Sequence, residues 1–266
     1  MHIRSVTTIL AALVVTVAFF LPETKAFAWN YYIDETTDYT NNGCPNITDV
    51  NTITSTLATA IIADGKTGSR YVNASALAAD FFESCMNLYG QDSIYADNAS
   101  LTVFAGHGGP GVLAFSYPSS PNSWCNVDFT NNMRLGAMNG AQSGFAMYLG
   151  CDALQVPNGL NAANMQWLKQ QFGWTNAISI GNNEPRDFYN MTYFSGTINA
   201  TAWLDQMDGG GRHPMVLTQD NNSANCWASH ATFKLRGSVG MSPAPRGGGP
   251  ACFSGPPSFW FCTETR

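Results

Sequence analysis

The sequence is poor in charged residues and in histidine, and it has no long apolar run beyond its first residues. Lysine, arginine, aspartate and glutamate together make up 11% of 266 residues, and the formal net charge is −6. A mildly acidic chain offers no basic surface to nucleic acid, so we expect no nucleic-acid partner. Asparagine, serine, threonine and glycine stand where charges would be, which is typical of an extracellular protein.

The one long apolar run, at the N-terminus, predicts export. Arg4 precedes an apolar stretch from Val6 to Leu21, and Ala26-Phe27-Ala28 has the small-x-small pattern after which signal peptidase cleaves. No later run approaches the roughly 20 residues of a membrane-spanning helix. We therefore predict a signal peptide over residues 1–28 and a secreted or periplasmic mature protein that begins at Trp29, without a transmembrane segment.

Little in the sequence supports metal chemistry. After cleavage only His107, His213 and His230 remain, and neither His-Glu-x-x-His nor Cys-x-x-Cys occurs. We therefore expect no bound metal and no cofactor. Calcium binding by the acidic residues of one downstream stretch stays open as an alternative to a solvated loop. These residues are Asp205, Asp208 and Asp220.

The mature part contains an odd number of cysteines. They are Cys44, Cys85, Cys125, Cys151, Cys226, Cys252 and Cys262. In an oxidising compartment six can pair and one is left over, and we expect Cys151 to be the leftover thiol. Because Cys252 and Cys262 share one Pro/Gly-rich tail, we predict a disulfide between these two.

Helix-like and strand-like segments alternate along the chain. The predicted helices are 49–64, 73–89, 131–141, 161–172 and 197–207, and the predicted strands are 101–106, 144–150, 177–180 and 215–218. Such alternation predicts an α/β fold, a three-layer sandwich with a largely parallel sheet whose apolar strands are covered on both faces. We expect one α/β domain over residues 29–240, followed by a Pro/Gly-rich, disulfide-stapled extension over residues 241–266.

Two of the predicted strands run into reactive residues. Leu101-Thr-Val-Phe-Ala-Gly106 leads into His107-Gly108, and Gly144-Phe-Ala-Met-Tyr-Leu-Gly150 leads into Cys151. The carboxyl ends of parallel strands meet at one edge of a sheet, where sites form in α/β proteins. A thiol becomes a useful nucleophile when an imidazole takes its proton. The sequence therefore predicts a Cys-His dyad at that edge.

This layout, with the block Val103-Phe-Ala-Gly-His-Gly-Gly-Pro110, resembles the caspase-like cysteine peptidases, the group that includes legumains, gingipains and metacaspases. More narrowly, it resembles a group of secreted bacterial proteins of unassigned function. The resemblance implies that Cys151 is the nucleophile and His107 the general base. It also implies that the backbone N–H groups of Gly108 and Cys151 hold the oxyanion, and that a peptide or protein is the substrate.

Some features depart from that pattern. Caspases place a basic or amide residue and then glycine after their cysteine, whereas this chain has Cys151-Asp-Ala-Leu154, so no substrate-pocket residue is carried over. His107-Gly-Gly-Pro-Gly111 also resembles the oxyanion loop of α/β-hydrolases of the proline iminopeptidase kind, although no Gly-x-Ser-x-Gly follows. A non-catalytic secreted binding protein is a further alternative. Three residues are candidates to orient the imidazole: Asp128, Asp152 and Asp187.

Overall fold

The computed structural model describes residues 29–41, 44–83, 87–119, 124–129, 131–136, 144–155, 165, 168–220, 223–233, 235 and 260–265. The predicted signal peptide and most of the predicted extension lie outside these residues. No helix among them is long and apolar enough to cross a membrane.

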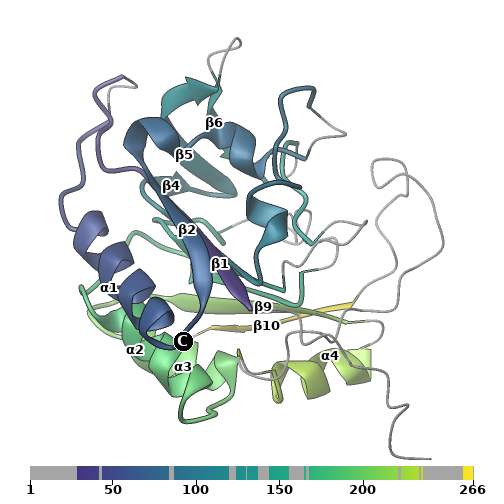
Figure 1. Cartoon of the computed structure of the whole chain (residues 1–266). Helices are drawn as coiled ribbons and strands as arrows, with labels where there is room; N and C mark the ends of the chain where they lie inside the picture. The colour runs from purple at the N-terminus through teal and green to yellow at the C-terminus, as the bar shows by residue number, and fades with distance from the viewer. Residues whose placement is uncertain are drawn as a thin grey trace, which may run out of the picture.

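Within the described residues, seven strands form a mixed central sheet in the order β2-β1-β3-β7-β8-β9-β10 (Figure 1). They are β1 (Asn30–Glu35), β2 (Thr67–Val72), β3 (Leu101–Ala105), β7 (Phe145–Leu149), β8 (Gln170–Trp174), β9 (Pro214–Asp220) and β10 (Trp260–Thr265). The first five are parallel, β9 is antiparallel to β8, and β10 is antiparallel to β9. The order of the first five is a common one for doubly wound sheets. The predicted α/β class and largely parallel sheet are confirmed.

The strands that carry the candidate site are buried along their whole length. Every residue of β3 and of β7 is buried. A parallel strand covered on both faces is expected to be a continuous apolar run, and this is why both strands could be recognised from the sequence.

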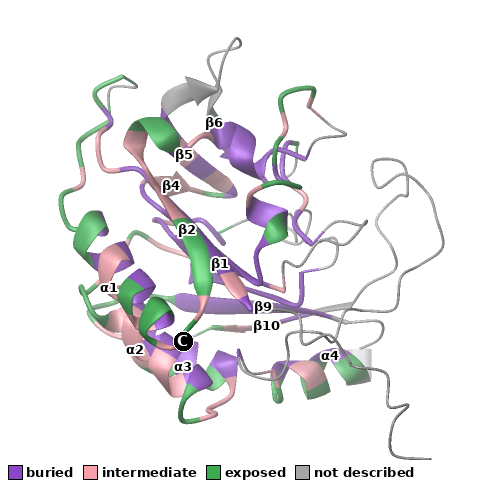
Figure 2. Cartoon of the chain, viewed as in Figure 1, coloured by how far each residue is buried: buried purple, intermediate pink, exposed green. Residues whose placement is uncertain are grey.

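Helices cover one face of the sheet. They are α1 (Val50–Ala63), α2 (Glu184–Tyr193) and α3 (Asn199–Met207), while α4 (Ser223–His230) packs on β9 and β10. The four-residue spacing of Ile53, Leu57 and Ile61 places all three in the core, and Figure 2 shows α1 buried on its inner side and exposed on its outer side. The predicted helices over 49–64 and 197–207 are confirmed.

The opposite face is covered mainly by shorter elements. These are the 3-10 helices η1 (Asn73–Ser75), η2 (Ala78–Phe81) and η3 (Ala96–Asn98), and a small antiparallel sheet of β4 (Gly108–Gly109), β5 (Val112–Ser119) and β6 (Trp124–Asp128). The predicted helix over 73–89 is therefore wrong. Ala76 and Leu77 are extended, and the buried Asp80 carboxylate accepts hydrogen bonds from the Tyr32 hydroxyl and the Leu77 N–H. These tertiary contacts outweigh the helical pattern.

Two further segments differ from expectation. Residues 168–172 of the predicted helix 161–172 lead into and form part of β8, and the predicted strand 177–180 lies in the connection after it. Gln170 and Gln171 are fully buried, and the Gln170 amide bonds Thr218 and Asn199, so a core strand carries a polar pattern. Residues 131–136 form turns and a bridge instead of a helix, and the rest of that prediction lies outside the described residues.

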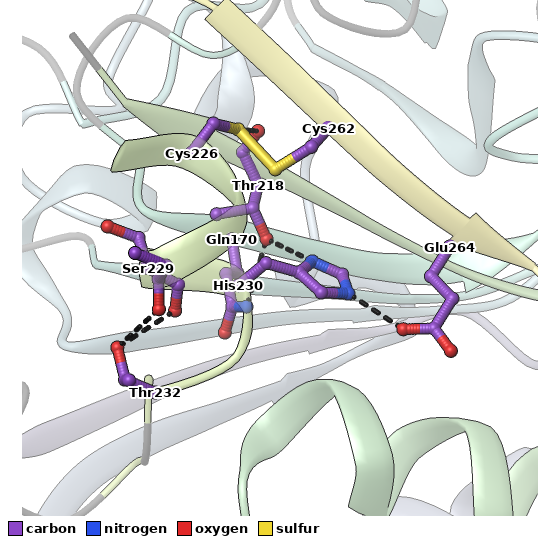
Figure 3. Close-up of a disulfide and its surroundings, with 9 residues drawn as sticks. Gln170, Thr218, Cys226, Ser229, His230, Thr232, Cys262 and Glu264 are labelled. Atoms are coloured by element: carbon purple, nitrogen blue, oxygen red, sulfur yellow. Dashed lines mark hydrogen bonds and ion pairs between the residues drawn. A yellow bond between two sulfur atoms is a disulfide. The ribbon is translucent and has the colours of Figure 1, made fainter. Parts of the chain in front are cut away.

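The C-terminal strand is fixed by a disulfide that the sequence did not predict. Cys262 of β10 is bonded to Cys226 of α4, with Cα atoms 6.0 Å apart (Figure 3). The predicted bond between Cys252 and Cys262 is therefore wrong. Because β10 pairs with β9 and places Cys262 opposite Thr218, its sulfur lies beside α4, and Cys252 is outside the described residues.

Candidate functional site

His107 and Cys151 follow neighbouring strands at the same distance beyond the sheet. Ala105 of β3 pairs with Leu149 of β7, and the Gly106 N–H then donates to the Leu149 carbonyl at 3.1 Å. Each reactive residue is thus the second after its strand, at the carboxyl edge. The neighbouring pair β1 and β3 is the switch point of the sheet, beside which α/β proteins place their sites.

The two loops touch through their main chains. A Cβ placed on Gly108 would lie 2.7 Å from the Cys151 carbonyl oxygen and 3.3 Å from the Cys151 nitrogen. A Cβ placed on Gly150 would lie 3.3 Å from the Gly108 nitrogen. Glycine at both positions is what allows the backbones to approach so closely. The structure therefore brings together Gly108 and Cys151, the two residues predicted to hold an oxyanion.

The Gly108 N–H is not used by the small sheet. The Ala114 N–H donates to the His107 carbonyl at 3.0 Å. This hydrogen bond lies next to the Gly108–Leu113 pair of the small sheet. In an antiparallel ladder the pair beside such a bond is the non-hydrogen-bonded one, so the Gly108 N–H points away from β5.

The imidazole is oriented by a backbone carbonyl. His107 Nε2 lies 2.7 Å from the Pro45 carbonyl oxygen. Since a carbonyl only accepts, Nε2 carries the hydrogen, and in the neutral ring Nδ1 is the free base; this tautomer is assigned from the hydrogen-bond partner.

None of the three predicted orienting carboxylates bonds the His107 ring within the described residues. Asp187 instead pairs with Arg186 at 2.7 Å, and Asp128 accepts from Asn131. Asp152 adopts a φ of 55° directly after Cys151. The strained position of this turn is thus Asp152 and not Cys151, unlike a nucleophile elbow, which is built around its nucleophile.

The sulfur of Cys151 is a thiol with defined neighbours. Cys151 is partly exposed and forms no disulfide. The Ile178 N–H donates to Sγ at 3.4 Å, and Sγ lies 3.8 Å from the Ile178 carbonyl oxygen, on the β8 side. The N–H can donate to the sulfur in either protonation state, whereas the carbonyl accepts only from the thiol.

A buried acid pair joins β1 to η2, with Asp34 on β1 and Asp80 on η2. The Tyr32 hydroxyl is 2.7 Å from Asp34 Oδ1 and 2.8 Å from Asp80 Oδ2. One hydroxyl proton serves only one of these oxygens, so the other carboxyl must donate its own. Burial raises the pKa of Asp34 well above its usual range and that of Asp80 to about 6.

The arrangement most suited to a metal ion lies away from the predicted stretch. Among the described residues, Glu83, Asp92 and Asp97 have ligand oxygens within 4.8 Å of one another, and all three side chains are buried. Carboxylate oxygens are the donors that calcium and magnesium prefer. Neither Asp205 nor Asp208 belongs to such a group within the part of the chain that is described.

A hydroxyl, an imidazole and a carboxylate also line up beside the disulfide (Figure 3). His230 Nδ1 lies 2.8 Å from Thr218 Oγ1, and His230 Nε2 lies 3.0 Å from Glu264 Oε2. The order of groups is that of a hydrolase triad. Thr218 has no exposed surface, however, so a substrate cannot reach its hydroxyl, and this chain of hydrogen bonds fixes α4 to the sheet.

Comparison with protein-family models gives one match over most of the chain. The model described as a domain of unknown function, DUF6345, matches residues 33–252. A search of curated proteins finds no match.

Proposed function

We propose a function for this chain, which belongs to the DUF6345 family. The proposal is a secreted, caspase-like cysteine peptidase that hydrolyses peptide bonds through Cys151 and His107. The observation that carries the proposal is the contact between the Gly108 backbone and the Gly150-Cys151 peptide at the carboxyl edge. It supports an oxyanion site directly beside a thiol, with an imidazole in the adjoining residue.

The tautomer of His107 suits a general base. With Nε2–H donating to the Pro45 carbonyl, Nδ1 accepts the proton of the Cys151 thiol. The thiolate attacks the substrate carbonyl carbon, and the negative charge moves onto the carbonyl oxygen. The Gly108 and Cys151 N–H groups stabilise that charge.

The remaining steps return the enzyme to its starting state. The tetrahedral intermediate expels the amine, which takes the proton from the imidazolium, and the acyl group stays on sulfur as a thioester. Water, deprotonated by His107, then hydrolyses the thioester and restores the thiol and the neutral imidazole. No cofactor enters this sequence.

Iodoacetamide labelling of the purified mature protein at pH 6 tests the dyad. The rate is followed for each cysteine by peptide mapping, because Cys44 is also exposed. We expect His107→Ala to slow carbamidomethylation of Cys151 at least about tenfold, since general-base assistance contributes roughly 10²–10⁴-fold. His213→Ala, which removes another exposed imidazole, should leave the rate unchanged.

The controls separate the alternatives. Equal rates in wild type and His107→Ala would contradict the dyad and favour a binding protein that keeps the fold. If only His213→Ala slowed the labelling of Cys151, the general base would be His213 and not His107.

A further inference from the structure

We propose that Tyr39 is a positioning residue for the catalytic base, an inference that rests on the proposed function. Tyr39 lies in the loop that follows β1, and its side chain is fully buried. Its ring packs against the His107 ring, with centroids 4.5 Å apart and planes inclined by 57°. The imidazole therefore has a rigid aromatic wall on one side.

The Tyr39 hydroxyl closes a small ring of hydrogen bonds around the base. The His107 N–H donates to the Tyr39 oxygen at 2.6 Å, and the Tyr39 O–H donates to the Ala114 carbonyl at 2.9 Å. Ala114 N–H in turn donates to the His107 carbonyl at 3.0 Å. A phenol both donates and accepts, so one hydroxyl satisfies both backbones. The backbone of His107 is thus fixed on its amide side and on its carbonyl side.

The glycine before the histidine makes room for this hydroxyl. A Cβ on Gly106 would lie 2.3 Å from the Tyr39 oxygen, far inside van der Waals contact. Any side chain at position 106 would clash with the Tyr39 hydroxyl. Glycine there therefore lets the phenol reach the His107 N–H.

The same loop also carries the group that orients the ring. Pro45, whose carbonyl accepts from His107 Nε2, lies six residues after Tyr39, and the loop is held at two places. The Tyr39 N–H donates to Asn46 Oδ1 at 2.7 Å. Asn73, in the left-handed region with a φ of 52°, accepts from the backbone of residues 37 and 38 at 2.8 and 3.0 Å. One anchored loop thus holds the backbone, the face and the Nε2 of His107.

Tyr39→Phe tests the role of the hydroxyl, because it keeps the aromatic wall and removes the hydrogen bonds. Tyr189→Phe is the matched control, since it removes another buried tyrosine hydroxyl, which bonds Asp64 on the far side of the fold. Two quantities are measured on each protein: the rate of Cys151 carbamidomethylation across pH, and the tautomer of His107 from imidazole ¹⁵N shifts.

We expect Tyr39→Phe to lower the rate about tenfold, given that misplacement by about 1 Å can cost 10²-fold. The ¹⁵N spectrum should change from the single Nε2–H tautomer to a mixture. Tyr189→Phe should match wild type in both measurements. Tyr39→Phe at the wild-type rate, with His107 in one tautomer, would overturn the positioning role even if His107→Ala still slows the reaction. If His107→Ala has no effect, the proposed function itself fails.

Discussion

Alanine should be harmful at Gly108 and harmless at Gly109, because the two neighbours differ in the space around them. A Cβ on Gly108 would meet only main-chain atoms, the nearest being the Cys151 carbonyl oxygen at 2.7 Å. Ordinary contact begins at 3.4 Å, so the two loops must separate by about 0.7 Å. Backbone atoms cannot rotate away as a side chain can. A Cβ on Gly109 has no atom within 4 Å.

We expect Gly108→Ala to cost about 1–3 kcal/mol in unfolding free energy, as overpacking does in well-packed regions. For a domain of this size that lowers Tm by roughly 2–12 °C. Carbamidomethylation of Cys151 should slow about tenfold, because the loop that carries His107 moves away from the loop that carries Cys151. Gly109→Ala should match wild type in both assays.

This prediction fails if Gly108→Ala keeps wild-type Tm and wild-type labelling of Cys151. It also fails if both alanine variants lose the same amount, since a general effect of glycine replacement would then explain the result. Differential scanning calorimetry and peptide mapping on the same preparations distinguish these outcomes.

Three further predictions concern stability. Arg70→Ala should destabilise by about 3 kcal/mol in urea unfolding, because it leaves the fully buried Glu35 carboxylate without the guanidinium that lies 2.6 Å away. Burial raises the pKa of Asp80 to about 6, so the folded protein binds this proton more tightly than the unfolded chain. The contribution of Asp80 to stability should therefore be complete below about pH 4 and should be lost, about 3 kcal/mol in all, as the pH rises through 6. Replacing Cys226 and Cys262 together with serine should cost roughly 4 kcal/mol, because the bond closes a loop with a sequence separation of 36.

A control variant tests each of these predictions. Adding Glu35→Gln to Arg70→Ala should restore part of the loss, and a further loss would show that the ion pair is not the cause. Asp80→Asn should flatten the pH dependence of urea unfolding, and an unchanged slope would assign it to another group. Cys252→Ser should leave the disulfide-linked peptide of Cys226 and Cys262 intact in a non-reducing digest.

β3, β7 and β9 could be predicted because each contains a short apolar run, whereas β1, β2 and β10 were missed. β3 and β7 stood out for this reason, and so did the residues that follow them, His107 and Cys151. β8 could not be recognised, since it buries the polar Gln170, whose partner Thr218 is distant in sequence. Burial of a polar residue depends on tertiary partners, which one sequence does not show.

The contacts that hold the base could not be predicted for a different reason. The group that orients the His107 ring is the carbonyl of Pro45, and every residue has a carbonyl, so no residue type marks the position. Tyr39 is likewise distant from His107 along the chain, and it reaches the histidine because its loop follows β1, which pairs with β3. In the sequence, only Gly106 indicated that another group packs against the backbone of His107.

Peptide hydrolysis is the measurement closest to the central claim. The mature protein is incubated with a proteome-derived peptide library, and new peptide termini are identified by mass spectrometry. The account predicts new termini with wild type and with Gly109→Ala, and none above background with Cys151→Ala or His107→Ala. The same cleavages from Cys151→Ala, or no cleavage by the wild-type protein, would contradict it.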